Sequence, residues 1–303
     1  MNLLSLVHFS LALVLAPLLP GIINKTKAFF AGRRGAPLLQ AYYDLWKLLH
    51  KSAVYSATRS WLFQLGPPAG LACVLSVALI TPFGGVGALV GFSGDLILLA
   101  YLLGLMRFLT VLAAWDTGSS FEGMGASREV QFSALAEPAL LLGLAAIVRL
   151  TGLYSLSTIF PALSMGSYLS AGPVLALVGT ALLIVFLAEN SRIPVDDPTT
   201  HLELTMIHEV MVLDHSGPDF AFILYGAMLK LWVLGAIFVN IVLPIRTGSP
   251  ALDSALALLS MFLLAVLVGV IESSMARLRL LRVPRLLVGA VVLSGLAFVL
   301  LLR

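Results

Sequence analysis

The feature that most limits the fold of this chain is a series of apolar runs, each about twenty residues long. An α-helix of that length crosses the hydrocarbon core of a bilayer, because each residue adds about 1.5 Å to a core about 30 Å thick. A mean hydropathy of +1.04 and a hydrophobic fraction of 60% over 303 residues leave little sequence for a water-soluble domain. We therefore expect an all-α integral membrane protein with a single membrane domain over residues 1–303.

Polar breaks between the apolar runs predict about eight transmembrane helices. The expected spans are 3–23, 62–82, 94–115, 130–150, 171–190, 219–244, 252–276 and 284–302. Four connections are charged, and we expect them to be the cytoplasmic loops: 24–61, 116–129, 191–218 and 277–285. The first run lacks a basic segment before it and an obvious cleavage site, so it is interpreted as a retained helix rather than a cleaved signal peptide.

Most lysines and arginines lie in those four loops, which explains the formal net charge of +3 and the pI near 9.1 without nucleic-acid binding. The positive-inside rule then predicts that these loops lie in the cytoplasm and that both termini lie on the outer side of the membrane. We expect a multi-pass protein of the cytoplasmic (inner) membrane of a bacterium or archaeon. The lone cysteine, Cys73, excludes an intrachain disulfide and a cysteine-rich zinc or iron–sulfur site on this chain. Any redox centre is therefore expected on partner subunits.

The first loop contains the stretch LLQAYYDLWKLLHK, in which the apolar residues recur at helical spacing. Leu38, Tyr42, Leu45 and Leu48 fall on one face, and the charged residues lie elsewhere. This pattern predicts an amphipathic loop helix, which would lie at the membrane surface or against a partner.

The third loop gathers five acids and three of the five histidines between Asp196 and His215. Pro198 suits the first position of a helix that would run to about Leu213. A spacing of seven would place His201, His208 and His215 on one face of it, with Glu203 and Asp214 roughly opposite.

Such a helix suits a position between other proteins or along a polar cavity, and the alternative is a solvated loop. A zinc site is the weaker interpretation, because His208 and Glu209 are followed by Val212 where an HExxH motif needs its second histidine.

Charged residues also occur within the predicted spans: Arg107, Glu137, Lys230 and Glu272, with Glu189 at the end of one. A charge at the centre of a bilayer costs on the order of 2.5–3.5 kcal/mol on insertion scales, so such residues usually face partners or water. We expect Glu137 to lie on an ion path. Glu189 and Glu272 have an alternative, which is to pair with Arg192 or Arg277 near the membrane surface.

Several motifs resemble a known family. RRGAPLLQAYYDLWKLLHK is similar to an Arg-Gly-Pro segment of subunit 1 of respiratory complex I, although Ala36 displaces the usual proline by one position. WDTGSSFEGMGASREVQFSALAEPALLLG and ESSMARLRLLRVPR look closer to the membrane-anchor subunits of group 4 nickel–iron hydrogenases, such as formate hydrogenlyase. The resemblance covers nearly the whole chain.

The resemblance implies a subunit that couples redox chemistry in a peripheral arm to H⁺ or Na⁺ translocation. It implies a nickel–iron centre and iron–sulfur clusters on partner chains, with hydrogenase-like large and small subunits, an iron–sulfur protein and antiporter-like membrane subunits as partners. By resemblance we expect ion-pathway or coupling roles for Glu137, Glu189, Arg192, Asp196, Glu203, Asp214, Lys230 and Glu272. Partner docking is expected for Arg33, Arg34, Asp44, Lys47, Asp116, Arg128 and Glu129.

The sequence also departs from complex I. Where that family has closely spaced glutamates after the loop proline, this chain has Thr199, His201 and Glu203, which makes a standard quinone site doubtful. Histidines, with an unperturbed pKa near 6.5, are hypothesised to replace the lost acids. Three alternatives stay open: the corresponding subunit of a quinone-reducing complex I, a structural anchor that moves no ions, and a stand-alone transporter, although the sequence shows no convincing internal repeat.

Overall fold

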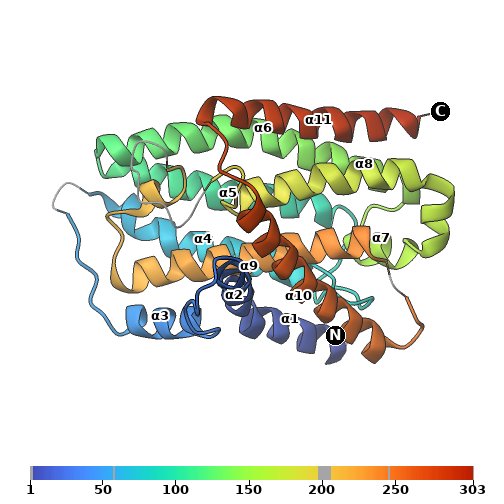
Figure 1. The fold of residues 1–303 in the computed structure, drawn as a ribbon, viewed down its shortest axis with the longest axis horizontal. Coiled ribbons are helices and arrows are strands. Elements are labelled where there is room, and N and C mark those ends of the chain that lie inside the picture. Colours follow the sequence, from blue (N-terminus) through green and yellow to red (C-terminus); the bar gives the residue numbers. More distant parts are fainter. Residues whose placement is uncertain (1–2, 57–58, 197–205, 245, 303) are drawn as a thin grey trace.

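The computed structural model describes residues 3–56, 59–196, 206–244 and 246–302. These residues form eleven α-helices and two 3₁₀ helices (Figure 1). The α-helices are α1 Leu3–Leu15, α2 Leu18–Phe30, α3 Gln40–Leu49, α4 Trp61–Ile80, α5 Asp95–Asp116, α6 Ser120–Thr151, α7 Leu156–Ala162, α8 Met165–Glu189, α9 Gly217–Val242, α10 Pro250–Ser274 and α11 Val283–Leu300. The 3₁₀ helices are η1 Glu209–Val212 and η2 Leu280–Arg282.

Seven helical segments in the described part of the chain are long and apolar enough to cross a membrane. The pair α1 and α2 makes an eighth candidate, bent by 47° at the break between the two helices. Pro17 lies at this break, where its ring and its missing N–H interrupt the helical hydrogen bonds. The predictions of an all-α membrane fold and of an amphipathic helix in the first loop are both confirmed.

Loop contacts define two ends of the helix bundle. At the first, which we call the charged end, the Val54 amide donates to Ser216 Oγ (2.9 Å) and the Ser60 amide donates to Asp116 Oδ2 (2.6 Å). At the opposite end, the Gly94 amide donates to the carbonyl of Tyr154 (2.9 Å). Figure 1 shows both chain termini in the right half of the view, away from α3 at the charged end.

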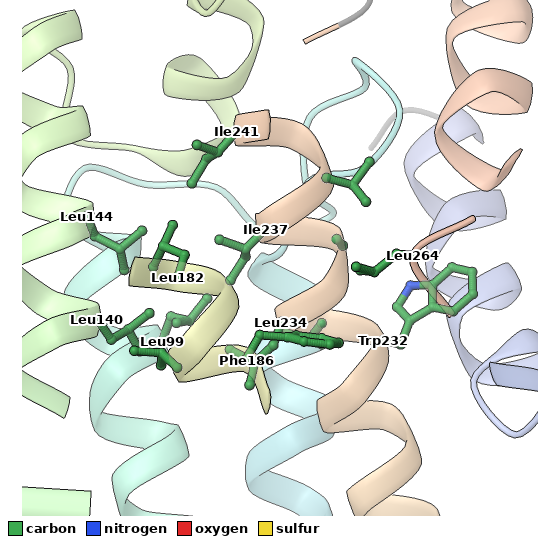
Figure 2. Close-up of a cluster of buried hydrophobic side chains, with 14 of the residues drawn as sticks. Leu99, Leu140, Leu144, Leu182, Phe186, Trp232, Leu234, Ile237, Ile241 and Leu264 are labelled. Carbon is green, nitrogen blue, oxygen red and sulfur yellow. The ribbon is translucent and has the colours of Figure 1, made fainter. Parts of the chain in front are cut away.

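The core lies around α9, which packs against α4, α8 and α10 (Figure 2). Leu99 of α5, Leu144 of α6 and Leu182 of α8 converge with Ile237 and Ile241 of α9 in one buried cluster. The outward faces remain apolar, as lipid or neighbouring membrane helices require.

Two segments differ from their predicted form. Residues 120–129, expected to be part of a loop, form nearly three turns at the start of α6. Only residues 117–119 separate α5 from α6. The predicted helix from Pro198 to Leu213 is not found in its described part, where 206–208 are non-helical and η1 is a single 3₁₀ turn. Residues 198–205 of that prediction, with His201 and Glu203, lie outside the described residues.

Candidate functional site

Arg107, in the middle of α5, lies at the centre of a group of buried carboxylates. Its Nε is 2.9 Å from Glu129 Oε1, and its two Nη atoms donate to Glu137 and Glu189. The side chains of Arg107, Glu129 and Glu189 are at most 10% exposed. One guanidinium therefore neutralises and orients carboxylates from α6 and from the end of α8, which its five fixed donors allow.

The group extends from Arg107 in two directions. Lys230 Nζ of α9 is 3.6 Å from Glu189 Oε2. On the other side, His208 Nε2 is 3.0 Å from Glu129 Oε2 and His208 Nδ1 is 3.5 Å from Asp196 Oδ2. Arg277 Nη2 then lies 2.9 Å from Asp196 Oδ1. We call this connected set the charge chain: Arg277, Asp196, His208, Glu129, Arg107, Glu137, Glu189 and Lys230.

The close packing of α6 against residues 206–212 positions His208. Gly125 makes this possible, because a Cβ on it would lie 2.2 Å from Val210 Cγ1 and 2.9 Å from the carbonyl oxygen of Ile207. Arg128, which directly precedes Glu129, donates from Nη1 to the carbonyl of Met206 (2.8 Å). The same short stretch of α6 therefore fixes the loop backbone and presents Glu129 to the histidine.

Asp196 shapes the same turn from the other side. Its Oδ2 accepts the backbone N–H groups of Ile207 (3.3 Å) and His208 (3.2 Å), so one carboxylate binds both the backbone and the ring of the histidine. Burial would raise the pKa of Asp196, but the hydrogen bond and the charge of His208, together with Arg277, lower it.

The surroundings of His208 favour its protonated form. Burial alone would lower the pKa of His208, but the attraction of Glu129 and the hydrogen bonds with Asp196 and Glu129 raise it to about 9. His208 is therefore an imidazolium at neutral pH, held between two carboxylates. By contrast, burial lowers the pKa of His215 to about 4, and the ring of His215 stacks on Phe63 with centroids 3.9 Å apart.

Glu137 is the most exposed member of the charge chain. Its side chain is 48% exposed in a groove of about 450 Å³, which Tyr101, Leu105 and Phe108 of α5 also line. The groove walls are mostly apolar, and Arg107 and Glu189 form the rest of its polar part. Glu137 lies fourteen residues before the end of α6, about 21 Å at 1.5 Å per residue, and therefore deep within the span.

Glu272, near the end of α10, forms a separate group that we call the Glu272 cluster. Its carboxylate is fully buried, with Oε2 2.8 Å from Lys27 Nζ of α2 and Oε1 3.5 Å from Arg192 Nη1. The predicted alternative of pairing near the membrane surface therefore holds for Glu272 with Arg192. For Glu189 it does not, because Arg107 and Lys230 are the partners of Glu189.

Five of the predicted site residues are exposed and lie apart from both groups. Arg33, Arg34, Asp44 and Lys47 are exposed at the charged end. Asp214 is also exposed, and its backbone N–H donates to Glu122 Oε1 (3.0 Å), a buried carboxylate that the sequence analysis missed.

Three residues expected to dock partners make contacts within the chain. Asp116 accepts a backbone N–H, Arg128 donates to the loop, and Glu129 belongs to the charge chain. Lys27, Arg107, His208 and Arg277 complete the ion pairs, although none of them was among the predicted site residues. The positions of Arg107 in an apolar run and of His208 in an acidic loop were the available signal, but the pairing of residues as distant in sequence as Lys27 and Glu272 is invisible to local spacing.

A resident metal is not indicated by the described residues, which contain no group of three or more His, Cys, Asp and Glu side chains able to hold an ion. Cys73 is a buried free thiol. The chemistry that this geometry offers is the binding and redistribution of protons and charge across α5, α6, α8 and α9.

The NADH dehydrogenase family model matches residues 2–303. Formate hydrogenlyase subunit 4 of Escherichia coli strain K12 is 32% identical over 293 residues, with 95% of this chain and 94% of the relative covered. Hydrogenase-4 component C of the same strain is 34% identical over 306 residues, covering 97% and 95%. An NADH-quinone oxidoreductase subunit of Geobacter sulfurreducens is 29% identical over 246 residues, covering 76% and 73%.

A solved structure has the same fold. A chain of the membrane-bound sulfane sulfur reductase, an archaeal respiratory membrane complex, superimposes with a TM-score of 0.82 at 19% identity. The superposition covers 99% of this chain and 98% of the other.

Proposed function

Because this chain belongs to the NADH dehydrogenase family, which includes subunit 1 of complex I, we propose that it is the membrane-anchor and coupling subunit of an energy-converting complex related to group 4 nickel–iron hydrogenases. In this role it links redox chemistry in a peripheral arm to the translocation of H⁺ or Na⁺. In this proposal the redox centres, a nickel–iron centre and iron–sulfur clusters, belong to partner subunits.

The observation that carries this proposal is the continuity of the charge chain. It begins at Arg277 and Asp196, outside the spans, and ends at Glu137 deep within α6. Each step between neighbouring members is an ion pair of 3.6 Å or less. A structural anchor needs no ionisable residue at that depth, where an unpaired charge is costly.

Coupling follows from the sharing of Arg107 among three carboxylates. Redox turnover in the peripheral arm changes the charge near the 191–218 loop and so alters how strongly His208 holds Glu129. When His208 holds Glu129 less strongly, Glu129 attracts Arg107 more strongly, and the hold of Arg107 on Glu137 and Glu189 weakens. His208 thereby takes over the functional role of the loop glutamates of complex I, and we propose coupling rather than partner docking for Glu129.

The exposed residues of the first loop suit the docking of the peripheral arm. Arg33, Arg34, Asp44 and Lys47 lie free of the bundle around α3, where hydrogenase-like large and small subunits and an iron–sulfur protein would bind. This assignment places the charged end in the cytoplasm, as the positive-inside rule expects.

The groove at Glu137 suits an antiporter-like membrane subunit. Tyr101 is 74% exposed and Phe108 57% exposed beside a half-exposed carboxylate, a combination that hydrocarbon alone cannot solvate. A partner helix with a polar or protonatable side chain would cover the groove and continue the ion path.

The first experiment is gentle affinity purification from native membranes, followed by mass spectrometry of the co-purifying chains and nickel analysis. A large subunit with bound nickel, together with antiporter-like chains, is the expected result. Purification of this chain as a stable, active, solitary protein would contradict the proposal.

A second candidate, the corresponding subunit of a quinone-reducing complex I, is supported by the 29% identity to the NADH-quinone oxidoreductase subunit of Geobacter sulfurreducens. We favour the hydrogenase-like assembly because those relatives match at higher identity over nearly the full chain. Co-purification of NADH-oxidising subunits without nickel would reverse this preference.

A further inference from the structure

A small cavity lies at the opposite end of the bundle from the charge chain. Its volume is about 20 Å³, and α1, the end of α4, the 81–94 loop and α9 enclose it. Four of its lining residues carry polar side-chain atoms: Ser5, His8, Thr81 and Trp232. Phe83 closes it with an edge-on contact to the His8 ring, the centroids being 5.7 Å apart.

His8 is buried in this wall, at 7% exposure, and its hydrogen bond to α10 fixes its tautomer. His8 Nε2 lies 2.8 Å from Ser254 Oγ, and the Ser254 hydroxyl donates its only proton to the carbonyl of Pro250 at 2.6 Å. Ser254 Oγ must therefore accept from His8, so Nε2 carries the ring proton.

The second ring nitrogen of His8 is then left without a partner. Nδ1 of the neutral ring presents a lone pair, it is buried, and it makes no hydrogen bond with the residues that the structure describes. A buried polar atom in this condition is uncommon and costs free energy unless a bound water satisfies it. If the ring is protonated, Nδ1 becomes a donor that needs an acceptor, and a water serves in either case.

The neighbouring hydroxyl groups can complete such a site but cannot replace the missing donor. The Ser5 hydroxyl donates to the carbonyl of Gly87 (2.8 Å), and the Thr81 hydroxyl donates to that of Val77 (2.7 Å). Both oxygens keep lone pairs that can accept. Trp232 adds an indole N–H to the lining.

We propose that this cavity binds one ordered water molecule, which donates a hydrogen bond to His8 Nδ1. The volume is enough for one water, since about 10–15 Å³ of probe-occupied space holds a single molecule. Ser5, Thr81 and Trp232 provide the further polar partners that a buried water requires. The water joins α1 to α4 and α9 and hydrates a protonatable ring, in a part of the molecule to which the proposed coupling mechanism assigns no role.

The test is a cryo-electron microscopy map of the purified complex at about 2 Å, at which ordered waters are visible. A single peak about 2.7–3.2 Å from His8 Nδ1 is the expected result. An empty cavity in a map that shows other buried waters would overturn the inference. So would a peak with several shorter contacts to oxygen atoms, which would indicate a bound cation.

A variant isolates the contribution of the ring nitrogen. In His8→Phe an aromatic ring is kept and both nitrogens are removed, so the peak is expected to disappear, whereas in the control Leu4→Met, at an exposed position of α1, it should remain. Persistence of the peak in His8→Phe would show that the hydroxyl groups alone hold the water and would overturn the role given to Nδ1.

Discussion

The charge chain and the Glu272 cluster use the same chemistry in two different arrangements. In the Glu272 cluster, a carboxylate with no exposed surface is matched by two cations, and among the described residues its ion pairs end there. In the charge chain, three carboxylates share Arg107, and one of them, Glu137, is 48% exposed in a groove. The closed arrangement holds helices together, whereas the open one leaves a carboxylate that is accessible from the groove.

Replacing Arg107 is the strongest way to break the charge chain. Arg107→Leu leaves Glu129 and Glu189 buried with only His208 and Lys230 as partners, so we expect a loss of about 3–5 kcal/mol in the free energy of unfolding. Native gels and thermal unfolding of the complex measure this loss. Arg107→Lys, which keeps the charge but not the planar donors, should be intermediate. Wild-type stability of Arg107→Leu would contradict the central role of this residue.

The protonation of His208 should make the free energy of unfolding depend on pH, and this is the second largest effect that we expect. Its folded pKa of about 9 lies above the ordinary histidine value of 6.5, so its stabilisation is complete below about pH 6.5 and is lost as pH rises through about 9. The full contribution is about 3 kcal/mol at 1.36 kcal/mol per unit. The difference in melting temperature between wild type and His208→Gln should shrink from pH 6 to pH 9.5. A constant difference would exclude a charged His208.

The Glu272 cluster should respond in stability alone. Glu272→Gln keeps the shape and one acceptor but removes the attraction to Lys27 and Arg192, with an expected cost of about 1.5–3 kcal/mol. Thermal unfolding measures this cost. The number of ions moved per electron pair should match wild type, and a reduced ratio would place Glu272 on the ion path after all.

Glu137 should show the smallest stability effect. In Glu137→Gln the buried carboxylates Glu129 and Glu189 still neutralise Arg107, and the altered side chain is half exposed, so we expect less than about 1 kcal/mol. Thermal unfolding of the complex checks this value. A loss as large as that of Arg107→Leu would mean that Glu137 holds the bundle together rather than serving the ion path.

The sequence predicted the membrane fold because uninterrupted apolar runs permit few structures in a bilayer. It also singled out four of the eight members of the charge chain, Arg107, Glu137, Glu189 and Lys230, since charges in apolar helices are few. The pairing of these residues could not be predicted from the sequence, because Arg107 and Glu189, for example, are 82 residues apart. Only the packing of α5 against α6 and of α8 against α9 brings the carboxylates and cations together. The ion pairs of Glu129 were not predicted because its segment was expected to be a loop, whereas it forms the first turns of α6.

Ion translocation by the reconstituted complex tests the central claim most directly. We would measure ion uptake into proteoliposomes per electron pair transferred, for wild type, Glu137→Gln and the matched control Glu272→Gln. Loss of uptake in Glu137→Gln, with electron transfer and assembly retained and with a normal ratio in Glu272→Gln, is the result predicted. A wild-type ratio in Glu137→Gln would contradict the account, because ion translocation would then not depend on the carboxylate at which the charge chain ends.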